Sequence, residues 1–283
     1  MKSLTVEFPV AQVCEVLRLS RSGYYAWLKR KPSRRQSSDQ KLLPMIIQVH
    51  EQSRCSYGSP RVSQELQRRK HPCGRHRVAR LMRRNGLRGL QKRSFRPRTT
   101  DSNHGLAIAP NRLKQQPQPA APDRTWVADI TYIPMVQGRW LYLAVVMDLY
   151  SRRIVGWAVA DHLKSSLAQR ALSRALQTRR PCRGLVHHSD RGIQYASHEY
   201  RRLLESNQLL SSMSAQGNCY DNAAMESFFS TLKTELLHRH NWHSYSEVKL
   251  AIFDYIETFY NRRRLHSALN YQSPAEFEAH AQN

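Results

Sequence analysis

The chain of 283 residues changes its pattern at about residue 124, and this change is what most constrains its fold. Residues 1–123 carry 26 basic and 7 acidic residues, whereas residues 124–283 carry 19 and 14. Three strand-like runs follow the change, at 125–133, 140–149 and 153–160, and only short turns separate them. Short turns favour an antiparallel meander. We therefore expect a basic helical region in front of a unit that begins with three paired strands.

The remaining sequence of this second unit alternates between helices and short strands. Apolar periodicity predicts helices over 165–177, 197–206 and 221–238, and strand-like runs lie at 185–189 and 209–213. The expected fold class is α/β, a mixed sheet flanked by helices. We divide the chain into a basic helical region at 1–98, a Pro/Gln-rich linker at 99–122, and a core with a helical tail at 123–283.

Three carboxylates in the second unit are candidates for one site. Asp129 lies inside the first strand-like run, Asp190 ends the run Gly184-Leu-Val-His-His-Ser-Asp190, and Glu226 lies near the start of a predicted helix. Acids without a basic partner in the same run repel one another, and divalent cations are the usual way to neutralise such a cluster. Paired Mg²⁺ ions catalyse in-line attack on a phosphodiester. These acids therefore indicate metal-dependent phosphodiester chemistry.

The predicted helix around Glu226 carries a polar stripe. Asn222, Glu226, Ser230 and Lys233 recur at helical spacing, so Lys233 is well placed to meet a phosphate near the metals. Taken alone, Glu226 also fits an ordinary exposed helical glutamate. Asp148, at the end of the second strand-like run, is either a fourth member of the pocket or a residue that forms a turn or pairs with an arginine.

The basic region contains a candidate DNA-binding helix at 75–85. Its apolar residues share one face, and Arg77, Arg80 and Arg84 lie on the opposite face. A helix-turn-helix places its second helix in the major groove, and this segment suits that role. The alternative is a small helical domain with a solvated basic face. The net charge of +24 favours a polyanionic partner.

Other classes of protein fit the sequence poorly. The five cysteines are scattered and odd in number, without C-x-x-C spacing, which argues against a disulfide framework or a structural zinc site. His187 and His188 lack partners at zinc-finger spacing, so core or surface histidines are expected there. The longest apolar run, 140–147, is too short to span a membrane. A cytoplasmic, nucleoid-associated protein is expected.

Several motifs together resemble one family, the bacterial insertion-sequence transposases whose second reading frame carries a retroviral-integrase-like catalytic core. The core motifs are Trp126-Val-Ala-Asp-Ile-Thr-Tyr132, Val146-Met-Asp-Leu-Tyr-Ser-Arg152, His188-Ser-Asp-Arg-Gly-Ile-Gln-Tyr195, Gly217-Asn-Cys-Tyr-Asp-Asn-Ala223 and Glu226-Ser-Phe-Phe229. The flanking motifs are Tyr57-Gly58 with Arg61, residues 77–86, Tyr260-Asn-Arg-Arg-Arg-Leu-His266 and Ser273-Pro274. The resemblance covers about residues 5–278.

This resemblance implies a ribonuclease-H-like core and a DDE mechanism. Asp129, Asp190 and Glu226 would be both the catalytic residues and the ligands of two Mg²⁺ ions, with Mn²⁺ as a substitute. Hydrolysis would free the 3′ end of the element, and strand transfer would join that end to target DNA. The residues expected to contact DNA are Lys233, Asn222, Arg191, Arg61, Arg77, Arg80 and Arg84.

The expected partners are the element ends and target DNA, held by a homo-oligomer because two ends must be paired. In this family an upstream reading frame usually supplies the specific end-binding helix-turn-helix and a coiled coil, so an upstream-frame protein or a frameshift fusion is a further expected partner. Two other functions remain open: a nuclease of the same fold, such as a ribonuclease H or a Holliday-junction nuclease, and a non-enzymatic DNA-binding regulator.

Overall fold

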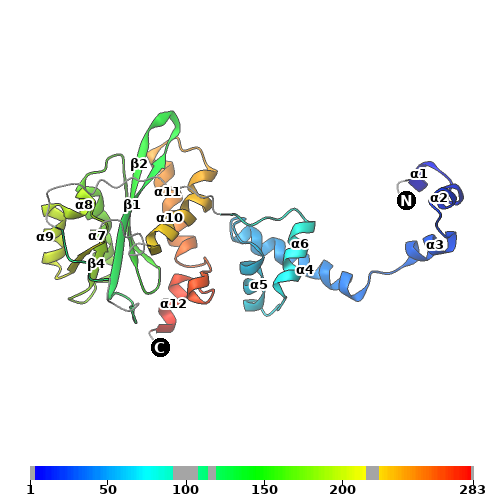
Figure 1. The fold of residues 1–283 in the computed structure, drawn as a ribbon, viewed down its shortest axis with the longest axis horizontal. Coiled ribbons are helices and arrows are strands. Elements are labelled where there is room, and N and C mark those ends of the chain that lie inside the picture. The colour runs from blue at the N-terminus through cyan, green and yellow to red at the C-terminus, as the bar shows by residue number, and fades with distance from the viewer. Residues whose placement is uncertain (1–3, 92–107, 114–118, 215–222, 282–283) are drawn as a thin grey trace.

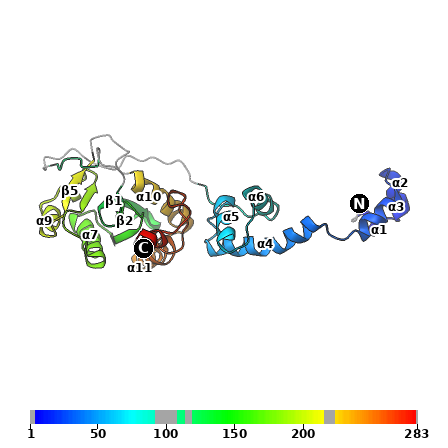
Figure 2. The same ribbon diagram turned by 90° about the horizontal axis from the view of Figure 1, so that it is seen from below.

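The computed structural model describes residues 4–91, 108–113, 119–214 and 223–281. Figures 1 and 2 show three parts in a row: an α/β core, a helical unit beside it, and three short helices at the far end. The short helices are α1 (Leu4–Glu7), α2 (Val10–Val16) and α3 (Arg21–Lys29). A membrane-crossing helix, which must be long and apolar, does not occur in the described part of the chain.

The helical unit consists of α4 (Arg34–Gln52), α5 (Ser59–Arg68) and α6 (Arg75–Arg84). Its centre is fully buried and apolar, with Ile46, Val62, Leu66 and Val78 at 0% exposure. Serine is a favourable N-cap residue, so the sequence predicts Ser59 as the N-cap of α5. In the structure the helix begins one residue earlier than this. Gly58 is the N-cap, and Ser59 is the first residue inside the helix.

The core contains a five-stranded sheet in the order β3-β2-β1-β4-β5. Its strands are β1 (Thr125–Pro134), β2 (Trp140–Asp148), β3 (Ile154–Ala160), β4 (Val186–Ser189) and β5 (Leu210–Met213). The first three pair antiparallel, while β4 runs parallel to β1 and β5 parallel to β4. The predicted mixed sheet and its antiparallel meander are confirmed.

Helices cover both faces of this sheet, as Figure 1 shows. One face carries α7 (Ser165–Arg179), α8 (Ile193–Ala196) and α9 (His198–Ser206), which pack on Trp126 and Ala128. The other carries α10 (Ala223–Glu235), α11 (Tyr245–Phe253) and a π-helical turn at Asp254–Tyr260, which pack on Val127. Because side chains alternate along a strand, consecutive residues of β1 point into the hydrophobic cores on opposite faces of the sheet.

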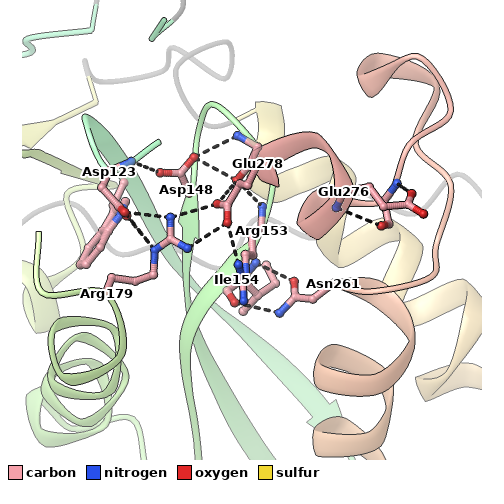
Figure 3. Close-up of polar contacts among 11 residues, drawn as sticks. Asp123, Asp148, Arg153, Ile154, Arg179, Asn261, Glu276 and Glu278 are labelled. Atoms are coloured by element: carbon pink, nitrogen blue, oxygen red, sulfur yellow. Dashed lines mark hydrogen bonds and ion pairs between the residues drawn. The ribbon is translucent and has the colours of Figure 1, made fainter. Parts of the chain in front are cut away.

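A buried ionic network fixes the C-terminal helix α12 (Pro274–Ala281) to the core (Figure 3). Glu278 accepts hydrogen bonds from Arg179, Arg153 and the Ser151 hydroxyl. Burial opposes ionisation of Glu278, but these hydrogen bonds outweigh it and lower the pKa of this carboxyl. Asp148 is fully buried nearby and accepts hydrogen bonds from the backbone amides of Ser151 and Asp123, so it forms a turn.

The helical unit docks on the tail of the core through polar contacts. The Leu265 amide donates to the Tyr57 hydroxyl at 2.7 Å, and Arg61 Nε donates to the Leu265 carbonyl oxygen at 3.0 Å. At the rim of this interface Arg54 pairs with Asp254 at 2.8 Å. The two parts are therefore joined by contacts between residues about 200 positions apart in the sequence.

Candidate active site

The parallel pairing of β1 with β4 brings two of the three candidate acids together. The last pair in this register is Ala128 with Ser189, so Asp129 and Asp190 are the next residues of two adjacent strands. The negative charges of both carboxylates also disfavour ionisation of the buried Tyr195 hydroxyl. Burial is the main cause that raises the pKa of Tyr195, and the charges of Tyr200, Asp129 and Asp190 raise it further.

Backbone amides hold each of these carboxylates in place. Asp129 Oδ1 accepts from the Ile130 amide at 2.7 Å, and Asp190 Oδ1 accepts from the Gly192 amide at 2.9 Å. A Cβ at position 192 would stand 3.0 Å from Asp190 Oδ1, closer than ordinary van der Waals contact. Glycine at 192 thus lets the chain turn tightly around the Asp190 carboxylate.

Asp129 faces the side of the sheet that α10 covers. It has the same parity in β1 as Val127, which packs in the core beneath α10. On α10 itself, burial lowers the pKa of Lys233, and the charge of Asp129 opposes this shift. The ammonium group of Lys233 is therefore close enough to Asp129 for an electrostatic interaction with its carboxylate.

Glu226 is exposed in the first turn of α10, seven residues before Lys233. At about 1.5 Å per residue, the two Cα atoms lie roughly 10 Å apart along the helix axis. Among the described residues, no three His, Cys, Asp or Glu side chains lie close enough to form a metal-binding group. The register of β1 and β4 thus brings Asp129 and Asp190 together, and Glu226 completes no three-residue metal group with them among the described residues. Asn222, the next candidate on the predicted stripe, lies outside the described residues.

The candidate DNA-contacting arginines differ in their surroundings. Arg77 Nε and an Arg80 terminal nitrogen bind the two carboxylate oxygens of Asp39, at 2.7 and 2.6 Å. Arg61 is half-buried against the tail of the core, and burial lowers its pKa. Arg191 Nε donates to the Ser214 carbonyl oxygen at 2.7 Å, and Arg84 is exposed at the end of α6.

These contacts give three of the candidates roles inside the protein. Asp39 compensates the charge of Arg77 and Arg80, and Arg61 joins the helical unit to the core. The charged face that the sequence predicts on α6 is therefore partly neutralised, by an acid 38 positions before Arg77. Nothing in the spacing of the arginines reveals this partner.

The two adjacent histidines are core residues, which is one of the two placements, core or surface, that the sequence leaves open. His187 Nε2 lies 3.0 Å from the Tyr200 hydroxyl, and His188 hydrogen-bonds the hydroxyls of Ser212 and Ser214. Both side chains are buried. Asp148 likewise has the turn-forming role that was one of its two predicted alternatives.

Tyr195 is the residue of the site that sequence analysis missed. Its hydroxyl is buried and has no hydrogen-bond partner among the described residues, although the two aspartates lie close enough to act on its pKa. The available signal was its position five residues after Asp190 in a short polar motif.

Comparisons with known proteins identify the family. The chain is 47% identical to the 31 kDa protein of insertion element IS600 from Shigella sonnei, over 94% of this chain and 97% of that protein. It is 40% identical to the transposase InsF of insertion sequence IS3A from Escherichia coli K12, over 96% of this chain and 94% of that protein. The chain belongs to the insertion-sequence transposase family.

Models of conserved domains cover most of this transposase-family chain. An integrase core domain matches residues 119–219, a second integrase core model matches 226–281, and an HTH-like domain matches 37–95. Among solved structures, a chain of the simian T-cell lymphotropic virus intasome in complex with PP2A regulatory subunit B56 gamma matches with a TM-score of 0.48 and 16% identity. That match covers 82% of this chain and 74% of the other. The HTH-like match contains most of α4 and all of α5 and α6, and the first core match contains all five strands.

Proposed function

We propose that this chain is a DDE transposase that cleaves DNA at the 3′ ends of an insertion sequence and transfers those ends to target DNA. The observation that carries the proposal is the register of β1 and β4, which sets Asp129 beside Asp190. Membership of the transposase family supports it. The catalytic residues in this proposal are Asp129, Asp190 and Glu226.

The chemistry of the site fits a divalent metal. Two neighbouring carboxylates repel each other unless a cation or a proton neutralises them. The unpartnered Tyr195 hydroxyl beside them is a buried polar group of the kind that a hydrated site would satisfy. Asp129, Asp190 and Glu226 would hold two Mg²⁺ ions, with Mn²⁺ as a substitute. When bound, such ions supply charge neutralisation and a more acidic nucleophile.

Glu226 has to approach the two aspartates for all three acids to act together. It lies in the first turn of α10, and the chain just before that helix lies outside the described residues. The side chains of Met225, Phe228 and Leu232, which lie on both sides of Glu226 in the sequence, are buried and hold α10 in place. We infer that the exposed Glu226 carboxylate joins the aspartates when metal and DNA bind.

The other side chains of the site position the DNA. Lys233, next to Asp129, offers a cation to the phosphate that reacts. The nucleophile is water in the cleavage step and the freed DNA 3′-hydroxyl in the joining step. In each step the 3′-oxygen of the attacked strand leaves, so no protein side chain forms a covalent bond with DNA. Asn222, Arg191, Arg84, Arg77, Arg80 and Arg61 remain candidate DNA contacts, the last three only if they exchange their present partners.

Two DNA ends have to meet for transposition, so we propose a homo-oligomer in which at least two protomers contribute a site. An upstream-frame protein, or a frameshift fusion with it, is a further proposed partner. DNA supplied as a single element end would then be joined only after two protomers assemble on it. Localisation with the nucleoid follows from the same DNA binding.

An experiment on Asp190 tests the active-site assignment. Asp190→Asn removes one carboxylate charge and keeps the shape of the side chain. We expect the variant to bind DNA as well as or better than the wild type, because repulsion of phosphate falls, and to lose cleavage of an element-end substrate in Mg²⁺. Gel-shift and cleavage assays on the same preparation measure both. Cleavage at the wild-type rate would show that Asp190 is not catalytic.

A further inference from the structure

A groove of about 890 Å³ lies where the helical unit meets the core. Its walls come from the start of α5, the end of α6 with the segment that follows, and the end of α10 with the turn after it. Figure 1 shows the helical unit next to the side of the core that carries α10 and α12. The groove is thus a feature of the docked arrangement and not of either part alone.

The lining of this groove is basic. Its 14 lining residues include three arginines, Arg83, Arg88 and Arg239, and no aspartate or glutamate. All three arginines are exposed. Within the described part of the chain, neither Arg83 nor Arg88 has a carboxylate at salt-bridge distance, whereas Arg77 and Arg80 share Asp39. Arg83 and Arg88 therefore keep uncompensated positive charge in the groove, whereas Asp39 offsets part of the charge on the face of α6 that carries Arg77.

The backbone of the groove adds to this charge. Gly58, the N-cap of α5, is extended and has no side chain to accept the amides of the first turn, so the positive end of a ten-residue helix opens onto the groove. Gly89 makes the close approach possible, because a Cβ there would stand 2.5 Å from the Gly58 nitrogen. Leu90 then donates its amide to the Ser56 carbonyl oxygen. This folded-back segment keeps Arg88 beside the start of α5.

The groove also reaches α10, the helix that carries Glu226 and Lys233. Thr234 lines the groove and directly follows Lys233 in this helix. The groove and the candidate active site therefore share one structural element. The wall formed by the end of α10 and the turn after it is tied to the helical unit, because an Arg239 terminal nitrogen donates to the Arg54 carbonyl oxygen at 2.8 Å.

We propose that this interdomain groove binds the phosphate backbone of duplex DNA next to the reacting end. The inference rests on the proposed function for the statement that a DNA end lies at the acids. Phosphates are the ligand because the groove combines arginine side chains with an open helix N-terminus and no carboxylate. Sequence readout is not required of it, since phosphate contacts position DNA without specifying bases.

The test measures DNA binding in EDTA, where no metal-dependent chemistry occurs. A fluorescent duplex of mixed sequence is titrated with wild type, Arg83→Ala, Arg88→Ala, the double variant and Arg88→Lys over a range of salt concentrations. Arg202→Ala is the matched control, because Arg202 is an exposed arginine on α9, at the opposite side of the core. Thermal melting checks that each variant is folded.

We expect each alanine substitution to weaken binding several-fold and to lower the slope of log Kd against log salt by about 1, with about 2 for the double variant. Arg88→Lys should restore most of the slope, because it keeps the charge. Slopes equal to that of Arg202→Ala would overturn the groove proposal, even if the protein joins DNA normally. Lowered slopes in a protein that never joins DNA would leave the groove standing and count against the proposed function instead.

Discussion

At the scale of single residues, the two buried tyrosines Tyr195 and Tyr200 differ in one respect. The Tyr200 hydroxyl lies 3.0 Å from His187 Nε2, whereas the Tyr195 hydroxyl has no partner among the described residues. Removing a buried unpaired hydroxyl relieves its desolvation, while removing a paired one leaves its partner unsatisfied. The same substitution should therefore have opposite effects at the two positions.

The pair Tyr195→Phe and Tyr200→Phe tests this difference. We expect Tyr195→Phe to raise the free energy of unfolding by about 1 kcal/mol and Tyr200→Phe to lower it by about 1 to 2 kcal/mol. Urea titrations at neutral pH give both values. A loss at both positions would mean that the Tyr195 hydroxyl has a partner in the folded protein, with bound water or metal as the first candidates.

The pH dependence of stability also has a single-residue source. Burial, with a smaller contribution from the charge of His188, lowers the pKa of His187 to about 3 from 6.5. The unfolded chain therefore takes up a proton below pH 6.5 that the folded chain does not, and stability is lost as the pH falls from 6.5 towards 3. At pH 5 this loss should be about 2 kcal/mol.

Urea midpoints at pH 7 and pH 5 measure this loss. His187→Gln removes the titrating group, so the fall in stability between these two pH values should be smaller than in the wild type. The substitution His240→Gln, at an exposed histidine, is the control and should keep the wild-type fall. An unchanged fall in His187→Gln would show that other groups cause the acid sensitivity.

At the scale of elements, the packing of α7 on β3 depends on one glycine. A Cβ at Gly156 would stand 2.2 Å from the Ala171 carbonyl oxygen, which is backbone and cannot rotate away. We expect Gly156→Ala to lower the free energy of unfolding by about 3 kcal/mol, at the upper end for overpacking. Gly74→Ala should cost about 0.5 to 1 kcal/mol, because Ala is a poorer N-cap for α6 but its added carbon meets nothing within 4 Å. Similar denaturation midpoints for the two variants would contradict this account of the contact.

The elements themselves were largely predictable from the sequence. The run predicted at 125–133 is β1 (Thr125–Pro134), and the predicted helix at 165–177 is α7 (Ser165–Arg179). Both follow from local periodicity, which depends only on neighbouring residues. The pairing of β1 with β4 was not predictable in this way, because its register depends on contacts between segments about 60 residues apart. Asp129 and Asp190 could therefore be nominated from the sequence, but not placed side by side.

The surroundings of the arginines escaped sequence analysis for the same reason. The partner of Arg61 is the Leu265 carbonyl oxygen, 204 positions away, and that of Arg77 is Asp39, 38 positions away. Charge spacing on a helix predicts a basic face but says nothing about an acid that another helix brings to it. The uncompensated arginines are found only once the helical unit is seen docked on the core.

At the scale of the whole molecule, docking of the helical unit depends on the tail of the core. Buried Arg264 and Glu235 form an ion pair at 2.7 Å that ties this tail to α10, and Leu265, the next residue, receives the contacts of Tyr57 and Arg61. Burial opposes ionisation of Glu235, but Arg264 outweighs it and lowers the pKa of this carboxyl. One chain segment thus connects the helical unit to the helix that carries Glu226.

We propose that Glu226 acts with Asp129 and Asp190 in one site, although these three acids form no metal group among the described residues. The most direct test is Mg²⁺-dependent joining of a labelled, pre-cut element end into plasmid DNA by wild type, Glu226→Gln and Glu199→Gln. Glu199 is the matched control, because it too is an exposed glutamate in the first turn of a helix. We expect joined product from the wild type and from Glu199→Gln, and none from Glu226→Gln. Joining by Glu226→Gln at the wild-type level would contradict the three-acid site, and nicking without joining by the wild type would show a nuclease instead of a transposase.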